Sequence, residues 1–154
     1  MNHPVLDDPQ VQAILAQPYG RMSDAEYARR RAALATVMAR HDVDLLLVVA
    51  EQRSGTNVHW LTGWPVSTEA IVLFQPGERE TMFMEWYNHL PNARVLARDC
   101  DVRWGEHRGV QLAIEEAKRR GAKRVGVMGS LAWSKMRALA AALDPVDLGG
   151  EYPW

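Results

Sequence analysis

The run of residues 44–50, DLLLVVA, limits what this chain can fold into more than any other feature of the sequence. A strand with one face in water alternates apolar and polar residues, and this run shows no alternation after its first residue. Both of its faces must therefore be covered by other parts of the chain, as in the central strand of a parallel α/β sheet. The run predicts a sheet with helices on both sides.

The remaining hydrophobic patterns supply those helices and the neighbouring strands. The segment Ser23-Asp24-Ala25-Glu26 has the pattern of a capping box and predicts a helix from about Asp24 to His41. Strands at residues 69–75 and 81–86 are separated by a Pro-Gly-Glu turn and predict an antiparallel hairpin. The further predicted elements are, in chain order, a strand at 94–98, a helix around 110–117, a strand at 124–128, a helix around 136–143 and an edge strand at 146–148. Together they predict a three-layer α/β domain with a mixed, mostly parallel sheet.

Charge and composition exclude several classes of protein. The formal net charge is -1 over 154 residues, so no field of one sign attracts nucleic acid or an anionic membrane. The densest basic run, Arg29-Arg30-Arg31, lies on a predicted helix, where neighbouring positions point in different directions, and this favours a solvated face over a phosphate site. No apolar run approaches the ~20 residues that span a bilayer. We therefore expect no nucleic-acid or membrane partner.

Cysteine usage indicates the compartment. Cys100 is the only cysteine, which excludes an internal disulfide framework and agrees with a reducing cytoplasm. No histidine or asparagine arrangement in the sequence marks this residue as a nucleophile, so a buried thiol is the favoured interpretation. The sequence predicts a cytoplasmic protein.

The usual signatures of a catalytic site are missing from the sequence. The histidines lack the spacing of metal ligands, and no G-x-S-x-G pattern marks a serine nucleophile. The neighbouring carboxylates Glu115 and Glu116 should diverge on their helix and stay solvated. Residues 126–130, GVMGS, could place a phosphate or dinucleotide on free N–H groups, but the full glycine fingerprint is absent. A tight strand-to-helix turn with Ser130 near the cap is favoured there.

The stretch of residues 57–64, NVHWLTGW, follows the central strand and is rich in aromatic residues. The spacing from Val58 to Leu61 fits one helical turn, and Gly63 can adopt the positive φ that ends such a turn. Trp60 is expected to pack at the sheet. For Trp64, packing under the connection and contact with a ligand or partner are both open, because a tryptophan in this loop is well placed for either.

The order of these patterns resembles the N-terminal domain of the prolidase, aminopeptidase P and creatinase family. The similarity rests on a long helix carrying Arg30, Leu34 and Met38, followed by DVDLLLVV, NVHWLTGW, EAIVLFQPGE and KRVGVMG, and it spans residues 22–150. The resemblance implies a ribonuclease H-like fold. It also implies that this domain is not the catalyst, but builds a homodimer and lends a loop that shapes the active-site entrance of the partner subunit.

Members of that family carry a second, pita-bread domain, in which two Asp, one His and two Glu hold two metal ions that activate water. By this resemblance, no residue of the present chain is catalytic or ligates a metal. The two divalent metal ions are expected in a C-terminal catalytic domain, which this chain lacks. The resemblance thus divides the chain into an N-terminal arm (1–22), the creatinase/prolidase N-terminal-like domain (23–150) and the start of a linker (151–154) to the catalytic domain.

The same resemblance suggests which residues reach the substrate. The gating loop should be formed by residues 53–56 and by residues 64–69. Trp64, Ser67 and Glu69 are the expected substrate-gating residues, and Arg53 could clamp a carboxylate. Trp64 is expected to begin a projecting rim.

The sequence is therefore compatible with two functions. The first is the non-catalytic N-terminal domain of a metal-dependent Xaa-Pro dipeptidase or aminopeptidase-like hydrolase, contributing dimerisation and substrate gating. The second is a stand-alone binding module of the same fold, which would recognise a small ligand or peptide through the loop from Trp60 to Glu69.

Overall fold

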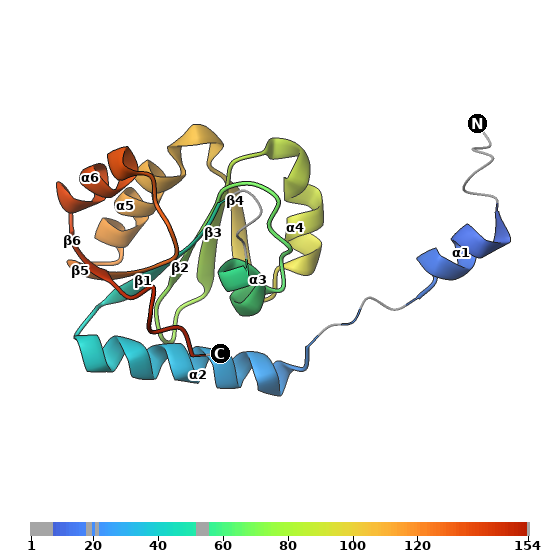
Figure 1. Cartoon of the computed structure of the whole chain (residues 1–154), viewed down its shortest axis with the longest axis horizontal. Coiled ribbons are helices and arrows are strands. Elements are labelled where there is room, and N and C mark those ends of the chain that lie inside the picture. Colours follow the sequence, from blue (N-terminus) through green and yellow to red (C-terminus); the bar gives the residue numbers. More distant parts are fainter. Residues whose placement is uncertain (1–7, 18–19, 21, 52–55, 154) are drawn as a thin grey trace.

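The computed structural model describes residues 8–17, 20, 22–51 and 56–153, and within them six strands form one sheet (Figure 1). The strands are β1 (Leu45–Ala50), β2 (Ala70–Phe74), β3 (Glu80–Met84), β4 (Cys100–Trp104), β5 (Arg124–Met128) and β6 (Asp144–Asp147). Their order across the sheet is β4-β3-β2-β1-β5-β6. Only β2 pairs antiparallel with its neighbours, and the other described strands all run in one direction. The sheet is mixed and mostly parallel.

Helices cover both faces of this sheet. They are α1 (Pro9–Leu15), α2 (Asp24–His41), α3 (Thr56–Thr62), α4 (Leu90–Leu96), α5 (Gly109–Arg119) and α6 (Trp133–Ala140), with short 3₁₀ turns η1 (Tyr87–His89) and η2 (Glu106–Arg108). Helices α2, α3 and α4 lie on one face and α5 and α6 on the other, whereas α1 lies apart from the body of the molecule (Figure 1). This confirms the predicted three-layer α/β domain.

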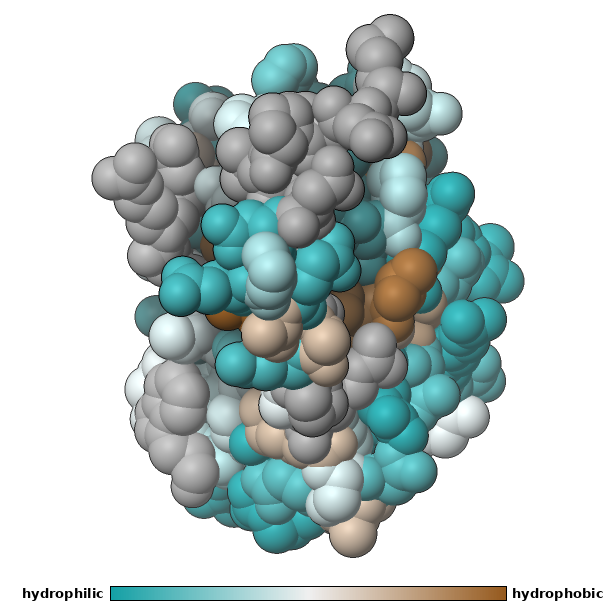
Figure 2. Space-filling model, turned by 90° about the vertical axis from the view of Figure 1, so that its right-hand side faces the viewer, coloured by the Kyte–Doolittle hydropathy of each residue, from teal (hydrophilic) through white to brown (hydrophobic). Residues whose placement is uncertain are grey.

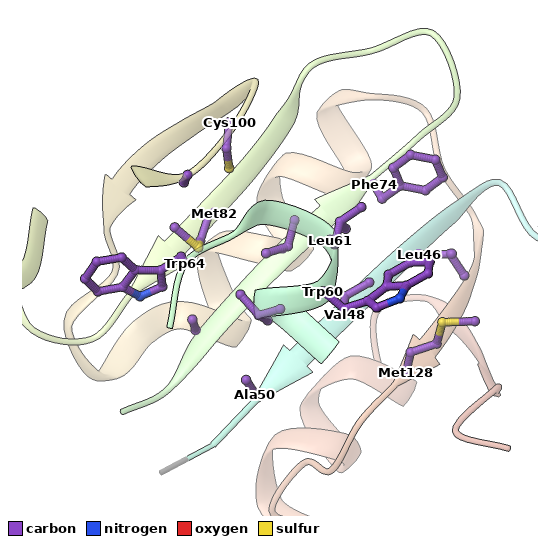
Figure 3. Close-up of a cluster of buried hydrophobic side chains, with 14 of the residues drawn as sticks. Leu46, Val48, Ala50, Trp60, Leu61, Trp64, Phe74, Met82, Cys100 and Met128 are labelled. Atoms are coloured by element: carbon purple, nitrogen blue, oxygen red, sulfur yellow. The ribbon is translucent and has the colours of Figure 1, made fainter. Parts of the chain in front are cut away.

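The central strand β1 is apolar throughout because each of its faces packs on a different helical layer. Leu46 and Val48 belong to the core cluster that includes α2 and α3, and Figure 3 shows them beside Trp60 of α3. Leu45 and Leu47 belong to the second cluster, with α5 and α6. Burying each such side chain contributes about 1.5–3 kcal/mol. The two-sided burial predicted for this strand is confirmed.

Helix α2 begins and ends where its sequence predicts. The Ser23 hydroxyl accepts a hydrogen bond from the backbone N–H of Glu26 at 3.2 Å, which satisfies one of the free donors of the first turn. Asp42 closes the helix in the left-handed conformation, with φ 52°. The buried residues Leu34, Val37 and Met38 then attach α2 to the sheet.

The prediction of a strand at residues 94–98 is wrong. Residues 90–96 form helix α4, which has Pro91 in its first turn and buries Leu90 and Ala93. The strand lies further along, at β4, where Cys100 and Val102 are buried and their neighbours are more exposed. Proline is favoured in the first turn of a helix, and this local preference, together with the burial of Leu90, decides the conformation.

The basic run of α2 is not a solvated face. Arg30 is only 9% exposed, and its guanidinium lies 4.9 Å from the ring centroid of Trp60 and donates to the Trp60 carbonyl at 2.6 Å. Arg31 donates to the carboxylate of Glu80 in β3 at 2.5 Å. The solvated interpretation is wrong for these two residues because long arginine side chains can lie across a packed interface and still pair their charge.

The expectation that Glu115 and Glu116 both stay solvated is wrong for Glu116. Its side chain is 6% exposed and accepts hydrogen bonds from Arg119 at 2.5 Å and from Arg120 at 2.9 Å. These donors hold the pKa of Glu116 down to about 2 against the opposing effect of burial. Helix packing on the sheet buried the carboxylate, and the arginines supply the compensating charge.

The glycine-rich turn after β5 is a packing feature. Gly129 has φ 116°, and a Cβ atom at this position would overlap the backbone carbonyl of Val49. The turn is therefore tight because it passes against β1. Ser130 lies two residues before Ala132, the N-cap of helix α6, so it is near the cap as predicted, but no side chain donates or accepts a capping hydrogen bond there. Cys100 is buried as expected, and burial raises the pKa of its thiol well above the usual range.

Seen from the side on which α1 and α4 lie, the surface is mostly hydrophilic, with a few small hydrophobic areas (Figure 2). Within the described ranges, none of the helices has the length and apolar character needed to cross a membrane.

Candidate functional site

The candidate site lies at the end of the sheet where the parallel strands terminate, which is called the edge below. Strands β1, β3, β4, β5 and β6 run in the same direction, so their carboxyl ends share one edge, and β2 begins at that edge. Residues that follow different strands are therefore brought together there. Ligand sites of open α/β sheets occupy this position because the loops that leave the strands diverge and form a crevice.

The loop after α3 starts with a tight turn that buries Trp64. Gly63 has φ 81°, and the Thr62 hydroxyl accepts a hydrogen bond from the backbone N–H of Trp64 at 3.1 Å. Trp64 is 6% exposed and belongs to the core cluster that includes α2, α3 and α4 (Figure 3). The expectation that Trp64 begins a projecting rim is wrong, because the turn directs its indole under the connection.

His89 of η1 connects three residues of the edge. Its Nδ1 lies 3.1 Å from the hydroxyl of Ser67, and its ring packs edge-on against Trp64 and Trp86, with centroid distances of 6.2 and 5.3 Å. Ser67 is exposed and lies 22 residues from His89 in the chain. The serine thus has a base beside it that no sequence spacing indicated.

Glu85, just after β3, is held by contacts from two other loops. Its carboxylate accepts a hydrogen bond from the hydroxyl of Thr68 and lies 2.9 Å from Nδ1 of His107. The hydrogen bond from Thr68 lowers the pKa of Glu85 below its usual range, so the group is ionised at neutral pH. The indole N–H of Trp104 donates to the Glu85 carbonyl at 3.1 Å. The edge therefore presents a fixed negative charge beside an aromatic ring.

Glu69 is paired rather than free. It is 9% exposed, and its carboxylate forms an ion pair with Lys135 of α6. The pair joins the start of β2 to the helix on the other side of the edge. The charge of Glu69 is therefore already balanced within the chain.

The structure brings most of the predicted gating residues to one edge but gives them different surroundings. Ser67 is exposed, Glu69 is ion-paired and Trp64 is buried. Arg53 lies outside the described residues. The described part of the chain holds no group of three or more His, Cys, Asp or Glu side chains that could bind a metal ion.

Sequence reasoning missed the aromatic part of this edge. Trp86, Tyr87 and Trp104 are 45%, 66% and 46% exposed and follow or end neighbouring strands. Because the sequence placed the strand at 94–98, Trp104 was not recognised as a strand end. The signal that could have found Trp86 and Tyr87 is their position shortly after the apolar run of β3, whereas Trp104 ends a strand whose pattern is weakly apolar.

Comparison with known proteins supports the arrangement of the fold. A model of the creatinase/prolidase N-terminal domain family matches residues 30–152. The N-terminal domain of the cytoplasmic peptidase PepQ from Mycobacterium tuberculosis is 22% identical with a TM-score of 0.67, and the match covers 79% of this chain and 94% of that one. An Xaa-Pro aminopeptidase from Streptococcus pyogenes is 17% identical with a TM-score of 0.67, covering 81% and 93%.

A longer structure shows how much of a whole dipeptidase the match covers. An Xaa-Pro dipeptidase from Bacillus anthracis is 15% identical with a TM-score of 0.66, and the match covers 81% of this chain but 35% of that protein. Most of the dipeptidase thus lies outside the matched region. No curated protein sequence matches the chain significantly.

Proposed function

The chain belongs to the creatinase/prolidase N-terminal domain family, and from this premise we propose that it is the non-catalytic N-terminal domain of a metal-dependent Xaa-Pro dipeptidase or aminopeptidase P-like hydrolase. Its role is to contribute to dimerisation and to gate the substrate. The observation that carries the proposal is the family match over residues 30–152, which accounts for nearly the whole of the three-layer domain.

The share of each relative that the match covers supports a non-catalytic domain that is separate from the catalytic domain. The chain spans 35% of the Bacillus anthracis dipeptidase but 94% of the Mycobacterium tuberculosis structure that is described as an N-terminal domain. The proposed partner is accordingly a C-terminal pita-bread catalytic domain, and two divalent metal ions belong in that domain. The described residues of the present chain do not fit such a centre, because they offer no cluster of metal ligands.

The gating role is assigned to the edge at the carboxyl ends of the strands. Ser67 is the expected residue best placed for contact, because its exposed hydroxyl is oriented by His89. Glu69 acts through its ion pair with Lys135, and Trp64 acts by supporting the ring of His89. A homodimer would bring this edge to the active-site entrance of the partner subunit. The single cysteine and the cytoplasmic peptidase among the relatives support a cytoplasmic location.

The proposal is tested by measuring hydrolysis of a panel of Xaa-Pro dipeptides with Mn²⁺, Co²⁺ or Zn²⁺. The 154-residue chain is compared with any longer product of its reading frame. We expect turnover only in the longer product, together with a dimer in sedimentation velocity. Metal-dependent turnover by the 154-residue chain itself would contradict a non-catalytic role.

The same assay tests gating in the longer product. Ser67→Ala should raise KM by about threefold to tenfold, the effect of one lost hydrogen bond. Ser134→Ala is the matched control, because this exposed serine of α6 lies outside the Ser67–His89 contact and should leave KM unchanged. Equal KM values for both variants would remove Ser67 from the gating role.

A stand-alone binding module for a small ligand or peptide is the second candidate. It is favoured by one observation, an open pocket of about 560 Å³ at the same edge, which residues of this chain line, although none of them belongs to the loop from Trp60 to Glu69. A reading frame that stops after Trp154, with no peptidase activity, would favour this candidate.

A further inference from the structure

The pocket at the ends of β3 and β4 is separate from the residues expected to gate the substrate. It is open, has a volume of about 560 Å³, and is lined by Glu85, Trp86, Tyr87, Asn88, Trp104, Glu106 and His107. Ser67 and Glu69 lie beside it but do not line it. The kind of ligand that this pocket can bind therefore depends on the residues that line it.

The walls of the pocket are aromatic and held in place. The rings of Tyr87 and Trp104 are in edge-to-face contact, with centroids 5.1 Å apart, and the indole N–H of Trp104 is anchored on the Glu85 carbonyl. Trp86 packs edge-on against His89. These rings nevertheless keep about half of their surface in water. Large aromatic side chains that are positioned but uncovered provide π faces for a ligand.

The charge of the pocket is negative. Glu85 contributes a carboxylate that Thr68 and His107 hold in position, and Glu106 contributes a second carboxylate. Among the described residues that line the pocket, none is Lys or Arg, and only His107 can become positive. An apolar or anionic occupant would displace water from the Glu85 carboxylate and leave only its contacts with Thr68 and His107 to offset the loss. The occupant that fits both the rings and the carboxylates is a cation.

We propose that this pocket binds a small organic cation, an ammonium or alkylammonium group, between the rings of Trp86, Tyr87 and Trp104 and the carboxylate of Glu85. The aromatic faces attract the cation through their quadrupoles, and the carboxylate supplies the opposite charge. The binding uses residues of this chain alone. It therefore holds whether or not the domain serves a peptidase.

The test titrates the 154-residue chain with choline chloride and, in parallel, with 3,3-dimethylbutan-1-ol, a neutral molecule of the same shape. Binding is followed in a two-dimensional ¹H–¹⁵N spectrum, in which each of the six tryptophans has an indole N–H signal. We expect saturable shifts of the Trp86 and Trp104 signals with choline, and binding of the neutral molecule weaker by about tenfold or more. The signal of Trp133, which is 76% exposed but outside the pocket, should not shift.

Variants locate the site. Glu85→Gln and Tyr87→Ala should each weaken choline binding by about fivefold or more, and Tyr87 is exposed enough for its loss to leave the fold intact. Trp133→Ala and Glu115→Gln are the matched controls, an exposed aromatic residue and an exposed carboxylate elsewhere, and should bind as the parent chain does. Equal affinity for the neutral molecule, equal losses in the controls, or no saturable shift would each overturn the proposal.

Discussion

At the scale of the single residue, Gly63 shows how backbone conformation and close packing act at one position. Its φ of 81° lies in the left-handed region, and a Cβ atom there would come within 2.5 Å of the hydroxyl oxygen of Tyr27. Tyr27 is 5% exposed and belongs to α2, so its ring would have to shift within the packed side of the helix to admit an added methyl group. The turn that leads from α3 into the candidate site therefore depends on glycine for two separate reasons.

Replacing Gly63 by alanine should lower the free energy of unfolding by about 2–4 kcal/mol, of which about 1–2 comes from the left-handed conformation and the rest from overlap with Tyr27. The matched control is Gly77→Ala. Gly77 has a similar φ of 83° but no heavy atom within 4 Å of the added Cβ, so only the conformational part applies. Urea denaturation measures both losses. Equal losses in the two variants would show that contact with Tyr27 plays no part.

At the scale of the element, an ion pair attaches α2 to β3, the strand next to the edge strand β4. Glu80 in β3 is 2% exposed and accepts from Arg31 at 2.5 Å, whereas the Arg31 side chain keeps 23% of its surface in water. Arg31 also lies 3.5 Å from the carboxylate of Asp99. Removing Arg31 would therefore leave Glu80 without a counter-charge, whereas removing the charge of Glu80 would leave Arg31 with Asp99 and water.

We expect Arg31→Met to destabilise the protein by about 3–5 kcal/mol, because it leaves the Glu80 carboxylate buried without a counter-charge. Glu80→Gln should cost less, about 1–2 kcal/mol, because Arg31 can turn to Asp99 and to water. Chemical denaturation at neutral pH gives both values. The order of the two losses is the critical result, and a larger loss for Glu80→Gln would contradict this description of the pair.

At the scale of the whole molecule, Glu116 joins three elements and so affects the acid stability of the entire domain. From α5 it accepts hydrogen bonds from Arg119 and Arg120, and it lies 3.4 Å from Arg103 of β4. Arg120 in turn donates to the hydroxyl of Thr81 in β3 at 2.7 Å. The arginine hydrogen bonds lower the pKa of Glu116 from 4.5 to about 2, so the charged form is favoured in the folded state.

A carboxylate whose pKa is lowered by folding stabilises the protein above its unfolded pKa, and that contribution is lost as the pH falls towards the folded pKa. For Glu116 the window runs from about pH 4.5 down to about pH 2, and the contribution is on the order of 3 kcal/mol. Glu116→Gln should be less stable than the parent at neutral pH and lose less stability on acidification. Urea unfolding at several pH values checks this. Glu115→Gln, at an exposed neighbouring position, is the control and should keep the parent's pH dependence.

The sequence by itself determined the elements that depend on local patterns. The apolar run of β1, the serine cap of α2, the hairpin of β2 and β3 and the turn at Gly63 were all predicted correctly, because each is specified by residues a few positions apart. Strand β4 was missed because its polar residues Asp101 and Arg103 weaken the apolar pattern at the edge of the sheet.

Only the tertiary structure decided which residues meet at the candidate site. Ser67 and His89 lie 22 residues apart, and Glu69 and Lys135 lie 66 apart, so their contacts depend on the order and direction of the strands that carry them. Burial of Trp64, Arg30 and Glu116 was decided in the same way, by the layers that pack on either face of the sheet. A sequence pattern specifies which face of an element is apolar. What that face and its polar neighbours contact follows only when all the elements are packed together.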